Sequence, residues 1–183
     1  KVKRLPELMK FILKENPDID VFVSGAGYGD FKSLENFSSL QIENFINLNL
    51  VSHIILCRAI VAHMKSHGNG DIFILGSEAG VIGKKKATLY SAAKFGLRGF
   101  AQALRNEAGP AGVRVCLINP GMVRSPFFDT LEFEPDGLET NAIETEDIAK
   151  IVFDFLGTRR GTIIDEINLS PASKSLKFKK SSK

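Results

Sequence analysis

The sequence predicts an α/β fold, in which helices cover both faces of a doubly wound parallel sheet. Three observations support this prediction. The strand-like segments are short runs of apolar residues, which is typical of parallel strands buried on both sides. Amphipathic helical patterns separate these runs, as in repeated strand–helix units. The chain has 183 residues and is 44% hydrophobic, which is enough apolar material for the core of one domain.

The predicted elements alternate along the chain. Apolar residues recur at helical spacing over residues 5–15, and Pro17 ends this helix. Three further helices are expected at residues 39–67, 87–109 and 146–156. Ser38 or Ser39 can cap the first of these three helices. The expected strands are residues 21–23, 72–75, 113–118 and 163–169.

The order of elements is unusual at the start of the chain. A complete doubly wound dinucleotide-binding fold opens with a strand, a glycine-rich turn and a helix. This chain instead opens with the helix at 5–15 and then the strand at 21–23. We therefore expect residues 1–170 to form the C-terminal two thirds of one domain that is incomplete at its N-terminus by roughly 60 residues. Residues 171–183 are expected to be a basic, solvated tail.

Charge and composition exclude several classes of protein. The formal net charge is +3, but residues 174–183 hold five lysines and no acid, which leaves 19 basic and 21 acidic residues elsewhere. This near-neutral body argues against binding to nucleic acid or to a membrane surface. No apolar run reaches 18 residues, so no membrane-spanning helix is expected.

The few cysteines and histidines predict neither disulfides nor a metal. Cys57 and Cys116 are isolated in apolar surroundings, whereas a disulfide framework needs more cysteines. A reducing, cytoplasmic location is therefore expected. His53, His63 and His67 have no paired cysteine ligands, so no zinc site is expected.

A glycine cluster follows the strand at 21–23. Gly25, Gly27 and Gly29 suggest a phosphate-binding turn, but the third glycine of G-x-G-x-x-G is missing. A clear helical pattern begins only about ten residues later, and Asp30 would place negative charge beside a pyrophosphate. We interpret the cluster as a tight turn whose glycines allow positive φ or close backbone approach.

Ser77, Tyr90 and Lys94 form the strongest catalytic pattern. Tyr90 and Lys94 are four residues apart on the helix at 87–109, so their side chains share a face. Ser77 follows the strand at 72–75 and therefore lies at the carboxyl edge of the sheet, where α/β folds bind ligands. A nearby ammonium lowers the pKa of a phenol, and a serine hydroxyl can hold a substrate oxygen during hydride transfer. Each residue alone is more often an ordinary surface residue, so the hypothesis depends on their combination.

The segments around these residues resemble the short-chain dehydrogenase/reductase family. Gly-Ser-Glu-Ala-Gly at 76–80 and Tyr-Ser-Ala-Ala-Lys-Phe-Gly-Leu at 90–97 are similar to its catalytic segment. Ser-Gly-Ala-Gly at 24–27 is similar to its Asn-Asn-Ala-Gly element, with both asparagines replaced. Asn49 matches its catalytic asparagine, and Asn-Pro-Gly-Met-Val-Arg-Ser at 119–125 matches its nicotinamide segment. The resemblance implies a Rossmann-like fold and hydride transfer between NAD or NADP and a carbonyl or secondary alcohol.

The resemblance also implies a role for each matched residue. Tyr90 would be the general acid/base, and Lys94 would lower its pKa and hold the nicotinamide ribose. Ser77 would orient the substrate oxygen, and Asn49 would support a water that relays protons to Lys94. The remaining residues would line the cofactor: Gly25, Ala26 and Gly27 on the adenosine side, and Pro120, Gly121, Val123 and Ser125 at the nicotinamide. The family's Thr-Gly-x-x-x-Gly-x-Gly turn and its residue that selects NAD or NADP have no match in this chain.

The sequence leaves the substrate and the partners open. Residues 126–145 resemble the family's substrate loop, where Phe127, Phe128, Leu131 and Phe133 either wall an apolar pocket or pack within a surface lid. The resemblance implies that the helices at 39–67 and 87–109 form the interface of a homodimer or homotetramer, and the alternative is that these helices simply pack on the sheet. One alternative function is a catalytically silent scaffold that binds a partner. Another is a nucleic-acid or membrane-surface binder that uses the lysine-rich end, which the charge of the body disfavours.

Overall fold

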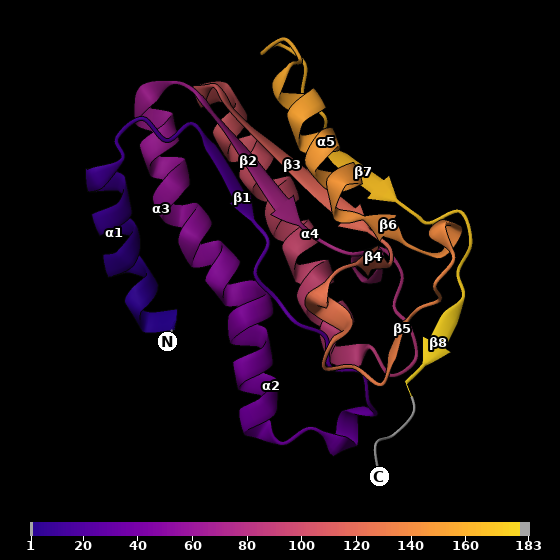
Figure 1. The fold of residues 1–183 in the computed structure, drawn as a ribbon. Helices are drawn as coiled ribbons and strands as arrows, with labels where there is room; N and C mark the ends of the chain where they lie inside the picture. Colours follow the sequence, from indigo (N-terminus) through magenta and orange to yellow (C-terminus); the bar gives the residue numbers. More distant parts are fainter. Residues whose placement is uncertain (1, 180–183) are drawn as a thin grey trace.

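The computed structural model describes residues 2–179, which form a parallel sheet between two layers of helices (Figure 1). The strands of this sheet, in spatial order, are β1 (Val21–Ser24), β2 (Gly70–Leu75), β3 (Val113–Pro120) and β7 (Glu166–Leu169). The helices are α1 (Leu5–Glu15), α2 (Ser39–Ile46), α3 (Ser52–His67), α4 (Thr88–Ala108) and α5 (Thr145–Leu156). All neighbouring strands in the sheet are parallel, which confirms the predicted fold class.

Alternation along the buried strands creates two separate cores. Ile72 and Ile74 of β2 point toward α3 and α4, and α1 covers the outer side of α3. Phe73 between them points to the opposite face, where it packs edge-on against Phe155 of α5 with ring centroids 4.9 Å apart. Because side chains alternate between the faces of a strand, a parallel strand covered on both sides must be apolar throughout. This explains the continuous apolar runs in the sequence.

The predicted long helix at 39–67 consists of α2 and α3 joined by a π-helical turn, Asn47–Val51. Ser38 caps α2, since its hydroxyl accepts from Gln41 N and the Gln41 side chain accepts from Ser38 N. By length and composition alone, Ser39–His67 could cross a membrane, which the sequence analysis did not expect. One such helix is weak evidence for a membrane span, because the core helix of a folded domain passes the same test, and α3 packs on the sheet.

The exposure of the strands near the edge of the sheet agrees only in part with what an incomplete fold would show. A doubly wound sheet that lacks its first strands should leave the apolar residues of 21–23 and 113–118 poorly covered. In β1, which lies at the edge, Val23 is 47% exposed. The prediction is wrong for β3, where residues 113–118 are fully buried because β2 and β7 flank this strand and helices cover both its faces.

The C-terminal part of the chain differs most from its prediction. The last strand of the main sheet begins at Glu166, because residues 163–165 do not pair as a strand. Leu176–Phe178 are exposed, as in the solvated tail expected from residue 171, but they form an unpredicted strand, β8 (Leu176–Phe178), which pairs antiparallel with β5 (Phe133–Pro135). Residues 180–183 lie outside the described part of the chain. Two further short strands, β4 (Val123–Arg124) and β6 (Ile143–Glu144), pair in parallel beside α5.

A buried ionic cluster ties together the amino ends of β2 and β3. The Arg114 guanidinium is 3% exposed and donates to both carboxylate oxygens of Asp71, at 2.6 and 3.0 Å. Arg160 donates to the same carboxylate at 2.9 Å and also to the carbonyl of Gly70. Arg114 also lies over the Phe155 ring, 4.4 Å from its centroid. The loop after α5 is thereby held against the sheet.

We expect Asp71→Ala to lower the free energy of unfolding by about 3–5 kcal/mol, because it leaves the Arg114 guanidinium buried without its carboxylate. The matched control is Asp154→Ala, which breaks an exposed ion pair with Lys150 and should cost at most about 0.5 kcal/mol. Urea denaturation of both variants measures the difference. Equal effects of the two substitutions would contradict the role given to the cluster.

Candidate active site

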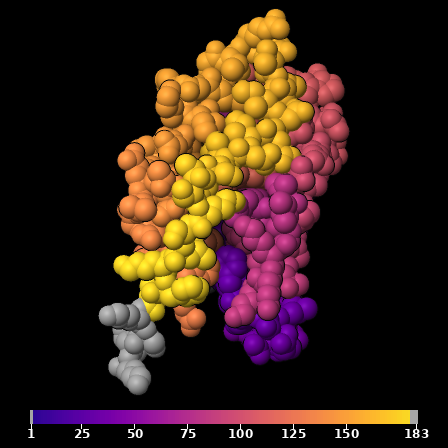
Figure 2. Space-filling model, turned by 90° about the vertical axis from the view of Figure 1, so that its right-hand side faces the viewer, coloured from indigo at the N-terminus to yellow at the C-terminus, as the bar shows by residue number. Residues whose placement is uncertain are grey.

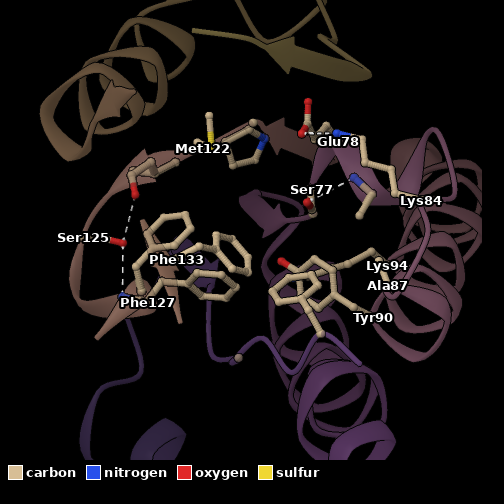
Figure 3. A pocket seen from close by; sticks show the side chains of 18 of the residues that line it. Ser77, Glu78, Lys84, Ala87, Tyr90, Lys94, Met122, Ser125, Phe127 and Phe133 are labelled. Carbon is tan, nitrogen blue, oxygen red and sulfur yellow. Dashed lines mark hydrogen bonds and ion pairs between the residues drawn. The ribbon is translucent and has the colours of Figure 1, made fainter. Parts of the chain in front are cut away.

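The carboxyl edge of the sheet opens into a cavity of about 800 Å³. The segments that follow β1, β2 and β3 all contribute to its lining, together with α4 and the segment between β4 and β5. Most of the predicted site residues meet here, namely Gly25, Gly27, Asn49, Ser77, Tyr90, Lys94, Pro120, Gly121, Val123 and Ser125. Ala26 does not line the cavity. Figure 3 shows Ser77, Tyr90 and Lys94 on one side of this cavity and Phe127 and Phe133 on the other.

Ser77 is positioned by the neighbouring strand. Its backbone N–H donates to Asn119 Oδ1 at 3.2 Å, and its hydroxyl accepts from Ala79 N at 3.1 Å. Asn119 lies in β3, is almost fully buried, and donates through Nδ2 to Glu166 Oε1 and Asn168 Oδ1 of β7. A side chain at Gly76 would collide with Asn119 Oδ1, so only glycine lets the chain pass here. The sequence analysis gave Asn119 no role of its own.

Tyr90 and Lys94 lie one turn apart on α4, and both are buried. Lys94 Nζ donates to Leu75 O at 3.0 Å and lies 5.7 Å from the centroid of the Tyr90 ring. Burial lowers the pKa of Lys94 from 10.5 to about 8. Burial also raises the pKa of Tyr90, although the hydrogen-bonding Ser77 side chain lowers it, and the Glu78 charge raises it further.

The direction of the Tyr90 shift differs from the sequence expectation. We expected Lys94 to lower the pKa of this phenol, as a close ammonium does. In the structure the loss of water around the hydroxyl has the larger effect, and the Lys94 ammonium is directed at the carbonyl of Leu75. Ser77 is therefore the neighbour that favours the phenolate here.

Asn49 lies in the π-helical turn and is fully buried. Its Nδ2 donates to Phe45 O at 3.1 Å, and its Oδ1 accepts from Tyr28 N at 3.1 Å. A Cβ at Gly27 would lie 2.7 Å from Asn49 Oδ1, so the glycine cluster has the close backbone approach that we expected as one possibility. Gly25, Gly27 and Gly29 do not have positive φ, the other possibility.

His53 is a buried residue of the site region that the sequence analysis passed over. Its Nε2 lies 2.7 Å from the Ala26 carbonyl, which only accepts, so Nε2 carries the hydrogen and Nδ1 accepts from the Ser24 hydroxyl at 2.7 Å. Burial, and then the charge of Lys94, lower the pKa of His53, while its hydrogen bond to Ala26 opposes the shift. His53 is thus held neutral and links α3 to the segment after β1. In the sequence, His53 lies one helical turn after Asn49, and this spacing could have identified it as a residue of the site region.

The donors in the cavity fit a nicotinamide cofactor. The Lys94 ammonium has three N–H donors, and among residues 2–179 it makes one hydrogen bond, so two remain for ribose hydroxyls. Within residues 2–179 the Ser125 hydroxyl makes only two long contacts, both 3.4 Å, with Val123 O and Phe127 N. It is therefore available to a carboxamide. Within the same range, no group of three or more His, Cys, Asp or Glu side chains is placed to hold a metal ion.

Comparisons with known proteins identify the family and the fold. The family model described as short chain dehydrogenase matches residues 1–135. Sepiapterin reductase from Chlorobaculum tepidum is 29% identical over 91% of this chain and 67% of its own length. D-xylose 1-dehydrogenase from Caulobacter vibrioides is 34% identical over 65% of this chain. This alignment spans 48% of the xylose enzyme, so the chain corresponds to between half and two thirds of these relatives.

A solved structure supports the fold. The alcohol dehydrogenase of the archaeon Thermococcus sibiricus, complexed with 5-hydroxy-NADP, superposes with a TM-score of 0.84 and 24% sequence identity. The superposition covers 96% of this chain and 73% of the archaeal one. A parallel sheet with flanking helices is therefore shared by the two proteins.

The lowered pKa of Lys94 makes stability depend on pH. Between pH 8 and pH 10.5 the unfolded chain still carries the ammonium while the folded chain has lost it. The unfolded state then binds more protons, so the free energy of unfolding rises with pH across this window, by roughly 3 kcal/mol in full. Below pH 8 both states are charged, and this contribution does not change.

We expect Lys94→Met to lack this rise, since methionine does not titrate. Urea denaturation at several pH values from about 7.5 to about 10.5 measures the rise in both proteins. Lys150→Met, at an exposed lysine of α5, should keep the wild-type slope. Parallel curves for wild type and Lys94→Met would show that the Lys94 pKa is not lowered by folding.

Proposed function

The chain belongs to the short chain dehydrogenase family, and on this premise we propose that the protein is an NAD(P)-dependent oxidoreductase acting on a carbonyl or secondary alcohol. The observation that carries the proposal is the convergence of Ser77, Tyr90 and Lys94 on one cavity. The names of the two curated relatives, a reductase and a dehydrogenase, support both directions of this chemistry. Bound NADH or NADPH would supply the hydride.

The residues that would hold the cofactor all line the cavity. Gly25 and Gly27 leave space on the adenosine side, and Pro120, Gly121 and Val123 present backbone to the nicotinamide. The two remaining N–H donors of Lys94 hold the ribose hydroxyls, and Ser125 receives the carboxamide. These assignments extend the family's pattern to the matching residues of this chain.

Tyr90 acts as the general acid when a carbonyl is reduced. Its raised pKa keeps the hydroxyl protonated at neutral pH, so it can give a proton to the substrate oxygen as the carbonyl carbon receives the hydride. The products are an alcohol and the Tyr90 phenolate. The Ser77 hydroxyl donates to the same substrate oxygen and stabilises the charge that develops on it.

Lys94 and Asn49 support this proton transfer. The Ser77 side chain favours the phenolate as it forms, and Lys94 Nζ, 5.7 Å from the centroid of the Tyr90 ring, is the nearby group that can return a proton to it. Asn49 keeps one N–H and one lone pair beyond its contacts with Phe45 and Tyr28. These groups can hold the water through which Tyr90 regains its proton by way of Lys94.

The same proposal includes self-association through the helices at 39–67 and 87–109. Leu48, Ile54 and Phe95 lie on these helices and are at least 36% exposed. Burying them against a second copy of the chain would remove apolar surface from water. A homodimer or homotetramer is the assembly that this surface favours.

We expect Tyr90→Phe to lower turnover of the full-length protein by at least about a hundredfold, the usual contribution of a general acid. Binding of NADH or NADPH should change little, because only the proton donor is lost. Steady-state kinetics and fluorescence titration of the cofactor measure the two effects separately.

The matched control is Tyr28→Phe, since the chain has only two tyrosines. The Tyr28 contact with Asn49 uses its backbone N–H, which the substitution keeps, and turnover should stay near the wild-type value. If Tyr90→Phe retains more than about a tenth of wild-type turnover, Tyr90 is not the acid. Cofactor binding without turnover of any carbonyl in the wild type would instead favour a silent scaffold.

A further inference from the structure

The wall of the cavity that faces Tyr90 is built from aromatic rings. Phe31 lies 5.2 Å from Tyr90 and 5.4 Å from Phe133, measured between ring centroids. Phe127 lies 6.0 Å from Tyr90 and 5.2 Å from Phe128. All five rings line the cavity, and Figure 3 shows Phe127 and Phe133 facing Tyr90 across it. A substrate whose oxygen reaches Tyr90 must therefore place the rest of its body among these rings.

The C-terminal strand completes this wall. Phe178 of β8 lies opposite Phe133 of β5 in the antiparallel pair, and both Phe178 and Leu176 line the cavity. Two contacts of the flanking lysines hold the strand in place. Lys174 Nζ pairs with Glu78 Oε2 at 2.6 Å, and Lys179 Nζ donates to Phe128 O at 2.5 Å. Figure 2 shows this yellow segment running along one face, with a hollow between it and the magenta residues.

Apart from Lys94 beside Tyr90 and the ion-paired Glu78, the charged residues that line the cavity are exposed. They are Lys84, Lys85, Lys86 and Glu132. Glu78 is neutralised by Lys84 at 2.6 Å and by Lys174. The aromatic wall itself offers no side-chain donor or acceptor except the Tyr90 hydroxyl. A polyhydroxylated substrate would lose hydrogen bonds to water on this wall without replacing them, whereas an apolar ring gains contact area.

We propose that the substrate is a carbonyl or secondary alcohol carried on a bulky apolar ring system, and that β8 is a specificity element for it. This inference rests on the proposed function and adds the chemical class of the substrate. Phe133 and Phe178 contact the ring system, while Ser77 and Tyr90 hold its oxygen. Small polar ketones can also bind to Ser77 and Tyr90 through their oxygen, but they do not contact Phe133 and Phe178.

The test compares 2-tetralone, an apolar bicyclic ketone, with dihydroxyacetone, a small polar one, in the full-length protein with NADPH or NADH. We expect KM for 2-tetralone to be at least tenfold below that for dihydroxyacetone. Phe178→Ala and Phe133→Ala should each raise KM for 2-tetralone about tenfold and change that for dihydroxyacetone less than twofold. Phe178 is 73% exposed, so its truncation leaves folding intact even if Phe133→Ala does not fold.

The matched control is Phe153→Ala on α5, which removes a ring that is 75% exposed and does not line the cavity. It should leave both KM values unchanged. Saturation-transfer NMR of 2-tetralone measures binding without turnover. If 2-tetralone binds to the wild type and Phe178→Ala weakens this binding, the inference is supported, whether or not a carbonyl is turned over. The absence of turnover would overturn only the proposed function. Turnover with equal KM values, unaffected by Phe133→Ala and Phe178→Ala, overturns the inference and leaves the function standing.

Discussion

The side chain of Asn119 connects three strands at the edge of the sheet where the candidate site lies. It accepts from the backbone of Ser77 after β2 and donates to Glu166 and Asn168 of β7. Because Asn119 is buried, losing any of these partners would leave a polar group unsatisfied. The position of Ser77, and with it the contact between Ser77 and Tyr90, therefore depends on one amide that the strands themselves hold rigid.

Burial sets the chemistry of the residues that this edge brings together. Removal of water lowers the pKa of Lys94 and of His53 and raises that of Tyr90, so every shift favours the neutral form. A phenol that stays protonated has a proton to give to a carbonyl. A lysine with a lowered pKa loses its own proton more readily than an exposed lysine does. The same desolvation that costs stability at neutral pH keeps Tyr90 protonated, as its proposed role of general acid requires.

Local patterns in the sequence predicted most of the fold. The helix at 5–15 and the strand at 21–23 follow from spacing and composition alone, and Ser38 has the capping contacts that its position suggested. Spacing and family resemblance predicted the four proposed catalytic residues, and in the structure all four line one cavity, namely Asn49, Ser77, Tyr90 and Lys94. The hydrogen bonds of Asn119 and His53 and the Asp71–Arg114 pair join residues 27 or more positions apart. No local pattern specifies such contacts.

The C-terminal strand illustrates this limit and also shows what it means for function. Its side chains are exposed, and the segment around it holds Lys174, Lys177 and Lys179, which are the features of a solvated tail. The C-terminal segment is held in place because the backbone of β8 pairs with β5 and because Lys174 forms an ion pair with Glu78. Both partners lie about 40 or more residues away in the sequence. The acid–base side of the cavity is thus encoded by a compact motif, whereas its aromatic wall depends on long-range pairing. Substitutions in β8 can therefore change the aromatic wall without disturbing Ser77, Tyr90 or Lys94.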